Sequence, residues 1–316
     1  MKYKRILYLL LTLLLLGGIL LQNLSIETSY QKEKTVVKFK GNPLEFFKNP
    51  LLIFTIFLYI LLFFLGLASI FIIIGKRLNK EPLLPSKPFI VEIKEEKSWK
   101  TMILVLLNIF ILNFMVIFFL HYHYLKRDLS FLIIYNFILE VIILVSLLAS
   151  LPKYRLGIRK QAFCPKKLVM IYSATLVALV PVVILNHFII NKLNLESTFH
   201  PLVTVIFSIK SKALLSLLIF QILFLGPVVE ELFFRGFLFS WLRKNISFGL
   251  STLVVSFIFA FLHPRLGNFL PLFTLSIVLC FIYDRTQNIF NSICVHTLHN
   301  FLGILLILSL KPYSFI

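Results

Sequence analysis

Long apolar runs alternate with short polar stretches along most of the chain. An α-helix needs about 20 predominantly apolar residues to cross the hydrocarbon core of a bilayer. Runs near that length occupy residues 6–21, 51–74, 101–120, 131–151 and 168–190. Further apolar runs follow at 214–225, 248–262, 269–283 and 289–310. The pattern predicts an all-α, polytopic membrane protein with about eight or nine transmembrane helices, in which 201–212 is either a span or a surface helix.

Gly226 and Pro227 end the apolar run that begins at residue 214. Proline suits the first position of a helix, so we expect a helix break here and a new helix over 228–244. Glu230 and Glu231 would then lie in the first turn of that helix. The positive end of the helix dipole favours anions at that position.

The chain is strongly basic, with 32 Lys and Arg residues against 13 Asp and Glu residues in 316. A nucleic-acid-binding protein would gather such charge on one soluble face, whereas here it lies in short loops between apolar runs. The loops at 76–100 and 152–167 hold seven and six basic residues, and those at 121–130 and 191–200 hold two and one. This asymmetry predicts a multi-pass membrane protein with its amino terminus inside. We expect the membrane to be the bacterial cytoplasmic one, with membrane lipids as partners and no nucleic acid. The run at 6–21 begins like a signal peptide but lacks a small-residue cleavage site after it, which favours an uncleaved span.

Three charged residues, Glu230, Glu231 and Arg235, interrupt sequence of membrane-like apolarity. A charge at the bilayer centre costs about 2.5–3.5 kcal/mol, so these side chains must face each other, water or a substrate. Glu231 and Arg235 are spaced i, i+4 and can pair on one helix. Glu230 points to another face, where a carboxylate in a low dielectric could act as a general base. A structural ion-pair network is an equal alternative.

Histidine and asparagine residues occur on two later apolar helices. His263 follows the run at 248–262, where it is either an interfacial histidine or a member of a site. His296 and Asn300 are spaced i, i+4 and therefore share one helix face. They could clamp two helices together by hydrogen bonds or donate to a developing oxyanion. His299 lies close to the same face and is a weaker candidate for either role.

The motifs Glu-Glu-x-x-x-Arg at 230–235, Phe-x-x-x-His at 259–263 and His-x-x-x-Asn at 296–300 follow one another on successive helices. In this order the chain resembles the type II CAAX prenyl endopeptidase and bacteriocin-processing family, also called the CPBP or Abi family of intramembrane proteases. The resemblance covers about 166–310. We therefore divide the chain into an N-terminal transmembrane region at 1–165 and a CAAX-protease-like catalytic domain at 166–316.

The resemblance implies an intramembrane endopeptidase that hydrolyses a peptide bond in a membrane-associated peptide or small protein. Glu230 and His263 would activate the attacking water, and His296 with Asn300 would stabilise the oxyanion. Glu231 and Arg235 would support the site. A divalent metal such as zinc is an open alternative, with Glu230, His263 and His296 as its ligands, but the absence of His-Glu-x-x-His favours water activated without a required metal.

Glu140, within the apolar run at 131–151, motivates a second hypothesis. An intramembrane carboxylate can relay protons, as in transporters, or can be tied to a neighbouring polar group such as Asn136 or His187. We favour the structural role. The alternative function is a non-catalytic transporter, or an immunity or interaction protein that retains the fold.

Overall fold

The protein is a helical membrane protein, as the apolar pattern predicts. A computed structural model describes residues 38–39, 48–84, 129–150, 165–193, 201–263, 268–311 and 314–315. Its helices are α3 (Pro50–Leu78), α5 (Leu129–Ser150), α6 (Pro165–Lys192), α7 (Pro201–Ser208), α8 (Lys212–Phe220), η3 (Gln221–Leu225), α9 (Gly226–Glu231), η4 (Leu232–Phe239), α10 (Ser240–Asn245), α11 (Phe248–Leu262), α12 (Phe269–Thr286) and α13 (Ile289–Leu310). The two-residue strands β1 (Lys38–Phe39) and β2 (Ser314–Phe315) pair antiparallel.

Within the described residues, five helices are long and apolar enough to cross a bilayer. They are Pro50–Leu78, Pro165–Lys192, Lys212–Asn245, Phe269–Thr286 and Ile289–Leu310. Along α3, Phe57, Phe64 and Phe71 recur every seven residues and are 62%, 63% and 76% exposed. Such a large exposed apolar face fits contact with lipid.

Six predicted spans coincide with helices to within a few residues: 51–74 with α3, 131–151 with α5, 168–190 with α6, 248–262 with α11, 269–283 with α12 and 289–310 with α13. The predicted spans at 6–21 and 101–120 lie outside the described residues, so the total number of spans remains a prediction. The division at residue 165 also remains a prediction. The ambiguous region at 201–212 forms the short helix α7, and α8 begins at Lys212.

The predicted break at Gly226 and Pro227 is wrong, because residues 212–245 form one continuous helix. The segment η3 has π-helical spacing, in which the Gly226 N–H donates to the Gln221 carbonyl five residues earlier. A π-bulge lets a helix continue where its hydrogen-bond ladder is disturbed. Glu230 and Glu231 consequently lie in the middle of a long helix and not in its first turn.

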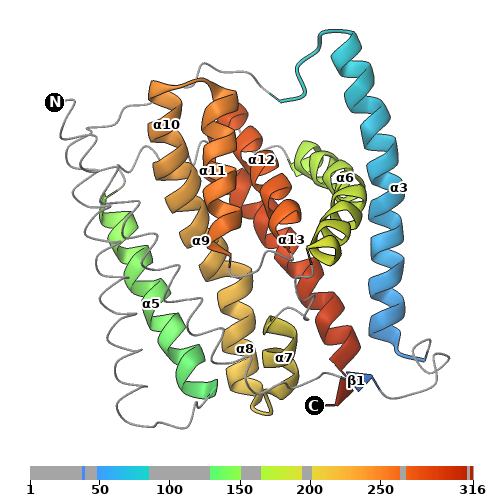
Figure 1. Ribbon diagram of the computed structural model, residues 1–316, viewed down its shortest axis with the longest axis vertical. Helices are drawn as coiled ribbons and strands as arrows, with labels where there is room; N and C mark the ends of the chain where they lie inside the picture. Colours follow the sequence, from blue (N-terminus) through green and yellow to red (C-terminus); the bar gives the residue numbers. More distant parts are fainter. Residues whose placement is uncertain are drawn as a thin grey trace.

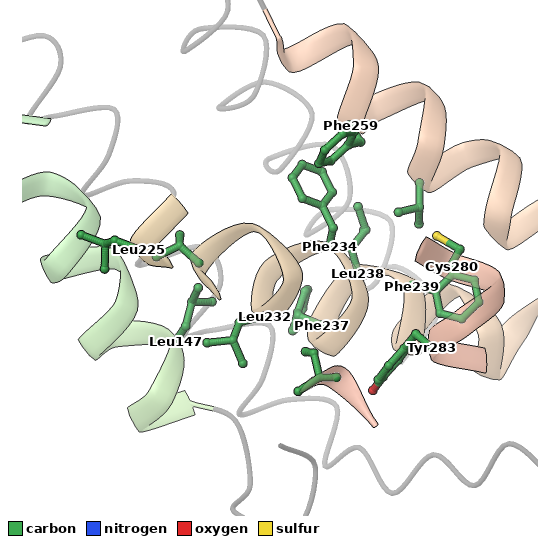
Figure 2. Packing of buried hydrophobic residues seen from close by; sticks show 13 residues of the cluster. Leu147, Leu225, Leu232, Phe234, Phe237, Leu238, Phe239, Phe259, Cys280 and Tyr283 are labelled. Carbon is green, nitrogen blue, oxygen red and sulfur yellow. The ribbon is translucent and has the colours of Figure 1, made fainter. Parts of the chain in front are cut away.

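The helix at 212–245 lies between α5 and the other described helices. Figure 1 shows α5 at one edge of the bundle and α3 at the opposite edge, with α13 crossing behind the centre. The main hydrophobic cluster is built on this helix. Figure 2 shows Leu225 and Leu232 of this helix near Leu147 of α5, while Phe259 of α11 and Cys280 of α12 lie on the other side.

The packing of α3 on α6 depends on small residues. Gly66 lies so close to α6 that a Cβ atom there would overlap the Ser173 carbonyl oxygen and come within 2.6 Å of a Val177 methyl carbon. Beside it, the Ser69 and Ser173 hydroxyl oxygens are 3.3 Å apart. Small residues of this kind let membrane helices approach until their backbones touch.

We expect Gly66→Ala to lower the thermal stability of the purified protein, because overpacking of a close helix contact costs about 1–3 kcal/mol. Gly75→Ala on the same helix is the matched control, since nothing lies within 4 Å of a Cβ there. The control should be neutral or slightly stabilising, as alanine favours a helix over glycine by about 1 kcal/mol. Thermal denaturation in detergent, followed by circular dichroism, measures both. Equal melting temperatures for the two variants would contradict this account of the packing.

Candidate active site

A fully buried ion pair lies at the centre of the charged motif. Arg235 Nη1 donates to Glu231 Oε1 at 2.9 Å, and neither side chain is exposed. Arg235 Nη2 also donates to the Ser276 carbonyl and hydroxyl oxygens, at 3.2 and 2.8 Å. The pair forms between residues i and i+4, as the spacing predicts. Because burial of an unpaired charge costs several kcal/mol, each member stabilises the other within the bundle.

His296 of α13 bonds to the Glu231 carboxylate and faces Glu230. Its Nδ1 lies 2.9 Å from Glu231 Oε1, and its Nε2 lies 3.8 Å from Glu230 Oε2. A carboxylate without a proton can only accept, so Nδ1 carries the hydrogen in this contact. The bond fixes the orientation of the ring and directs Nε2 toward Glu230.

The two adjacent glutamates have different environments. Glu231 is completely buried, whereas the Glu230 side chain is 34% exposed. Glu230 Oε2 is nevertheless a buried atom without a hydrogen-bond partner. Its 3.8 Å separation from His296 Nε2 is too long for a direct hydrogen bond and suits a bridging water. The two carboxylates therefore differ in burial and in partners, while their separate roles remain a prediction.

Phe259 connects the three motifs through its buried ring. Arg235 Cζ lies 4.9 Å from the ring centroid, and the rings of His263 and His296 lie 4.6 and 5.9 Å away. His263 Nδ1 is 2.7 Å from the Phe259 carbonyl oxygen. A carbonyl oxygen only accepts, so Nδ1 donates and His263 Nε2 is left as an acceptor. All three motifs therefore meet around one aromatic side chain.

Asn300 and its neighbour Thr297 bind the backbone of the charged helix. Asn300 Nδ2 donates to the Ile222 carbonyl at 2.9 Å, and Thr297 Oγ1 donates to the Leu223 carbonyl at 2.9 Å. With α-helical spacing, the N–H of residue 227 would donate to the Leu223 carbonyl, and with π-helical spacing it would donate to the Ile222 carbonyl. Residue 227 is proline, however, and has no N–H to donate. Two side chains of α13 thus supply donors that proline cannot. This is the interhelical clamp, while the oxyanion role of Asn300 remains a prediction.

His299 is held on a different side of α13. Its Nδ1 lies 3.3 Å from the Tyr172 hydroxyl of α6, and the two rings meet edge to face with centroids 6.2 Å apart. His296 instead bonds to Glu231 of the charged helix. The two histidines therefore contact different helices, and His299 packs α13 against α6.

Glu140 lies beside the site from α5. Its side chain hydrogen-bonds with Gln221 and is near enough to Glu230 for their charges to interact. The partners suggested from the sequence, Asn136 and His187, are both exposed residues. Sequence reasoning missed Gln221, as it missed Ser276 and Thr297. Each of the three is a polar residue in an apolar helix, which is the signal that could have identified it.

The metal hypothesis requires Glu230, His263 and His296 to converge. Among the described residues, which include all three, no group of three or more His, Cys, Asp or Glu side chains has the arrangement of a metal site. His263 Nδ1 and His296 Nδ1 both bond to the protein, which leaves the Nε2 atom of each ring as the one that could bind a metal. The metal hypothesis therefore stays a prediction, and no step below is routed through a metal.

Residues 212–302 match the family model described as Type II CAAX prenyl endopeptidase Rce1-like. The match is confined to this part of the chain, which is similar to that family. The matched segment contains all three motifs, from Glu230 to Asn300, and supports a CAAX-type intramembrane endopeptidase. No curated protein and no solved structure matches the chain.

A double-mutant cycle can test whether the Thr297 hydroxyl replaces the missing N–H of Pro227. Thr297→Val removes the donor to Leu223, and hydrogen bonds between membrane helices contribute about 0.6–1.7 kcal/mol. In a Pro227→Ala background residue 227 regains its N–H, so Thr297→Val should cost clearly less there. Thr175→Val is the matched control, because Thr175 Oγ1 donates within its own helix to Ile171.

The measurement for this cycle is thermal stability of the four purified proteins in one detergent. The control substitution should cost the same in both backgrounds. If Thr297→Val also costs the same in both, the hydroxyl does not replace the missing N–H of Pro227.

Proposed function

We propose that this protein is an intramembrane endopeptidase in which Glu230 is the general base for the attacking water. The observation that carries the proposal is the arrangement of Glu230, His296 and Glu231, in which one imidazole lies between two carboxylates. Glu230 is the carboxylate with partial access from outside and with a buried oxygen that has no donor. A water between Glu230 Oε2 and His296 Nε2 would meet both groups at once.

The hydrogen-bond partners of the two histidines suggest different roles for them. His263 donates its Nδ1 hydrogen to a carbonyl, so its Nε2 can accept and can assist Glu230 in orienting the water. His296 Nδ1 lies 2.9 Å from Glu231, and its Nε2 points toward Glu230 at 3.8 Å. A hydrogen on Nε2 would donate to the oxyanion of the tetrahedral intermediate. Asn300 has a second Nδ2 hydrogen that could do the same.

The reaction follows from these assignments. The water oxygen attacks the peptide carbonyl carbon while Glu230 takes one water proton. The carbonyl oxygen becomes an oxyanion stabilised by His296. The C–N bond then breaks as Glu230 returns the proton to the leaving amine, which restores the carboxylate. Glu231 and Arg235 hold His296 and do not exchange protons with the substrate.

The proposed substrate is a membrane-associated peptide or small protein, since the family description names prenyl endopeptidases that act on CAAX sequences. Bacteriocin precursors are a second proposed substrate class, which would give the protein a bacterial role in bacteriocin processing or immunity. We place the amino terminus inside and the membrane as the bacterial cytoplasmic one. Basic residues support this orientation, because they gather where α3, α10 and α12 end and α6 begins: Lys76, Arg77, Arg243, Lys244, Arg285, Lys166 and Lys167. The cytoplasmic side of a membrane protein is enriched in such residues.

The function is tested by cleavage of a farnesylated peptide with a CAAX ending, and of its unprenylated form, by the full-length protein in detergent. Glu230→Gln should lower kcat by about 10²–10⁴-fold, the usual contribution of a general base. His296→Leu should lower it by about 10²–10³-fold, the contribution of one oxyanion donor. Matched controls are Glu81→Gln and His187→Leu, both at exposed positions, which should retain activity.

The controls make the result decisive. If Glu230→Gln and His296→Leu remain folded and cleave as well as the controls do, the catalytic assignment is wrong. If the wild-type protein cleaves neither these peptides nor a bacteriocin precursor, the non-catalytic alternative gains support.

Metal dependence is tested separately on the same protein. We expect cleavage to survive treatment with a strong chelator, because the described side chains form no three-ligand set. Metal content is measured before and after treatment by elemental analysis. Loss of activity that zinc restores would show that a metal-bound water is the nucleophile.

A further inference from the structure

Helix α12 lies between the second and third motifs in the sequence and contains none of their residues. It nevertheless supplies two acceptors to the Arg235 guanidinium. Arg235 Nη2 donates to the Ser276 hydroxyl oxygen at 2.8 Å and to the Ser276 carbonyl oxygen at 3.2 Å. Ser276 is fully buried, and Nη2 has two hydrogens, one for each acceptor. The guanidinium is thus held by Glu231 on one side and by Ser276 on the other.

The same face of α12 also reaches the main chain of Arg235, through Ser240. Ser240 Oγ donates to the Arg235 carbonyl at 2.9 Å and lies 3.2 Å from the Tyr283 hydroxyl oxygen. Ser276 and Tyr283 are seven residues apart, which is about two helical turns, so both lie on one face of α12. Tyr283 also packs against Phe239 of η4, with ring centroids 6.1 Å apart. One face of α12 therefore supports both the backbone and the guanidinium of Arg235.

The position of Arg235 determines the position of His296, because one oxygen atom connects the two side chains. Glu231 Oε1 bonds to Arg235 Nη1 and to His296 Nδ1, at 2.9 Å in each case. If the guanidinium turns away from Ser276, it draws this oxygen and the imidazole bonded to it out of place. His296 Nε2 then loses its alignment with Glu230 Oε2, from which it is 3.8 Å away. A misplacement of about 1 Å in an active site can cost about 10²-fold in rate.

We propose that Ser276 is a positioning residue of the endopeptidase. It acts on His296 through the ion pair of Arg235 and Glu231. The Ser276 hydroxyl holds the guanidinium where the shared Glu231 oxygen can bond to the imidazole. The inference rests on the proposed function, because it concerns the same His296 Nε2 atom. It extends the site to α12, a helix that none of the three motifs includes.

Two substitutions separate the hydrogen bond of Ser276 from its packing. Ser276→Ala removes the hydroxyl, whereas Ser276→Cys nearly keeps the volume but offers a sulfur that accepts hydrogen bonds only weakly. Ser292→Ala is the matched control. Ser292 is also fully buried, and its hydroxyl donates to the Leu279 carbonyl of the same helix α12 at 3.3 Å. A melting temperature close to that of the wild type shows that a variant is folded.

The first measurement is cleavage of the farnesylated peptide by the full-length protein in detergent. Ser276→Ala and Ser276→Cys should each lower kcat by about tenfold, which is less than a full misplacement costs, because the Ser276 carbonyl remains as an acceptor. KM should stay unchanged, since a fully buried serine does not touch the substrate. Ser292→Ala should cleave as the wild type does. Equal kcat values for Ser276→Cys and Ser292→Ala would overturn the proposal, because packing would then explain any loss in Ser276→Ala.

The second measurement does not depend on cleavage. The chain has seven histidines, so NMR spectra of the full-length protein, labelled with ¹⁵N-histidine in lipid nanodiscs, contain few imidazole signals. The Nδ1–H signal of His296 is assigned by its loss in His296→Leu. Both Ser276 variants should shift or broaden this signal, and Ser292→Ala should leave it in place.

An unchanged His296 signal in both Ser276 variants would overturn the proposal, whatever the kinetics show. If the wild-type protein cleaves no peptide, the proposed function is in doubt. The His296 signal then still decides whether Ser276 positions the imidazole, so the two failures can be told apart.

Discussion

The buried pair of Glu231 and Arg235 is the interaction on which the rest of the site depends. Both side chains are fully buried; Arg235 also donates to Ser276 of α12, and Glu231 Oε1 also bonds with His296 of α13. The ring of Phe259 on α11 covers the guanidinium. One ion pair thus contacts each of the three helices that complete the site. A charge pair of this kind is costly to desolvate, and it is retained here where it fixes the position of a histidine.

Most helix positions and one ion pair could be predicted from the sequence. Apolar length alone predicted α11 and α13 closely, and the i, i+4 rule predicted the Glu231–Arg235 pair. The course of the chain at Pro227 could not be predicted, because it depends on Thr297 and Asn300 about seventy residues later. Local rules treat proline as a helix breaker, and only the packed structure shows donors that replace its N–H. The partner of Glu140 was missed for a similar reason, since helix packing decides which polar side chains meet.

Glu230 and Glu231, which are adjacent in one motif, differ in how deeply their carboxylates are buried. Glu231 is fully buried and bonds through one oxygen to both Arg235 and His296, so it orients its neighbours. Glu230, one residue earlier, is turned about 100° around the helix, and its side chain is 34% exposed. The same chemical group therefore serves as a fixed anchor at one position and as a reactive group at the next.

The attachment of α13 to the charged helix has a consequence for how the sequence can vary. Both clamping bonds end on main-chain carbonyls, at Ile222 and Leu223, which every amino acid possesses. The axial alignment of His296 with Glu231 is therefore independent of the side chains at 222 and 223. Those two side chains pack in the cluster with Ile206 and Ile304, so the packing there can change while the two reactive helices keep their register.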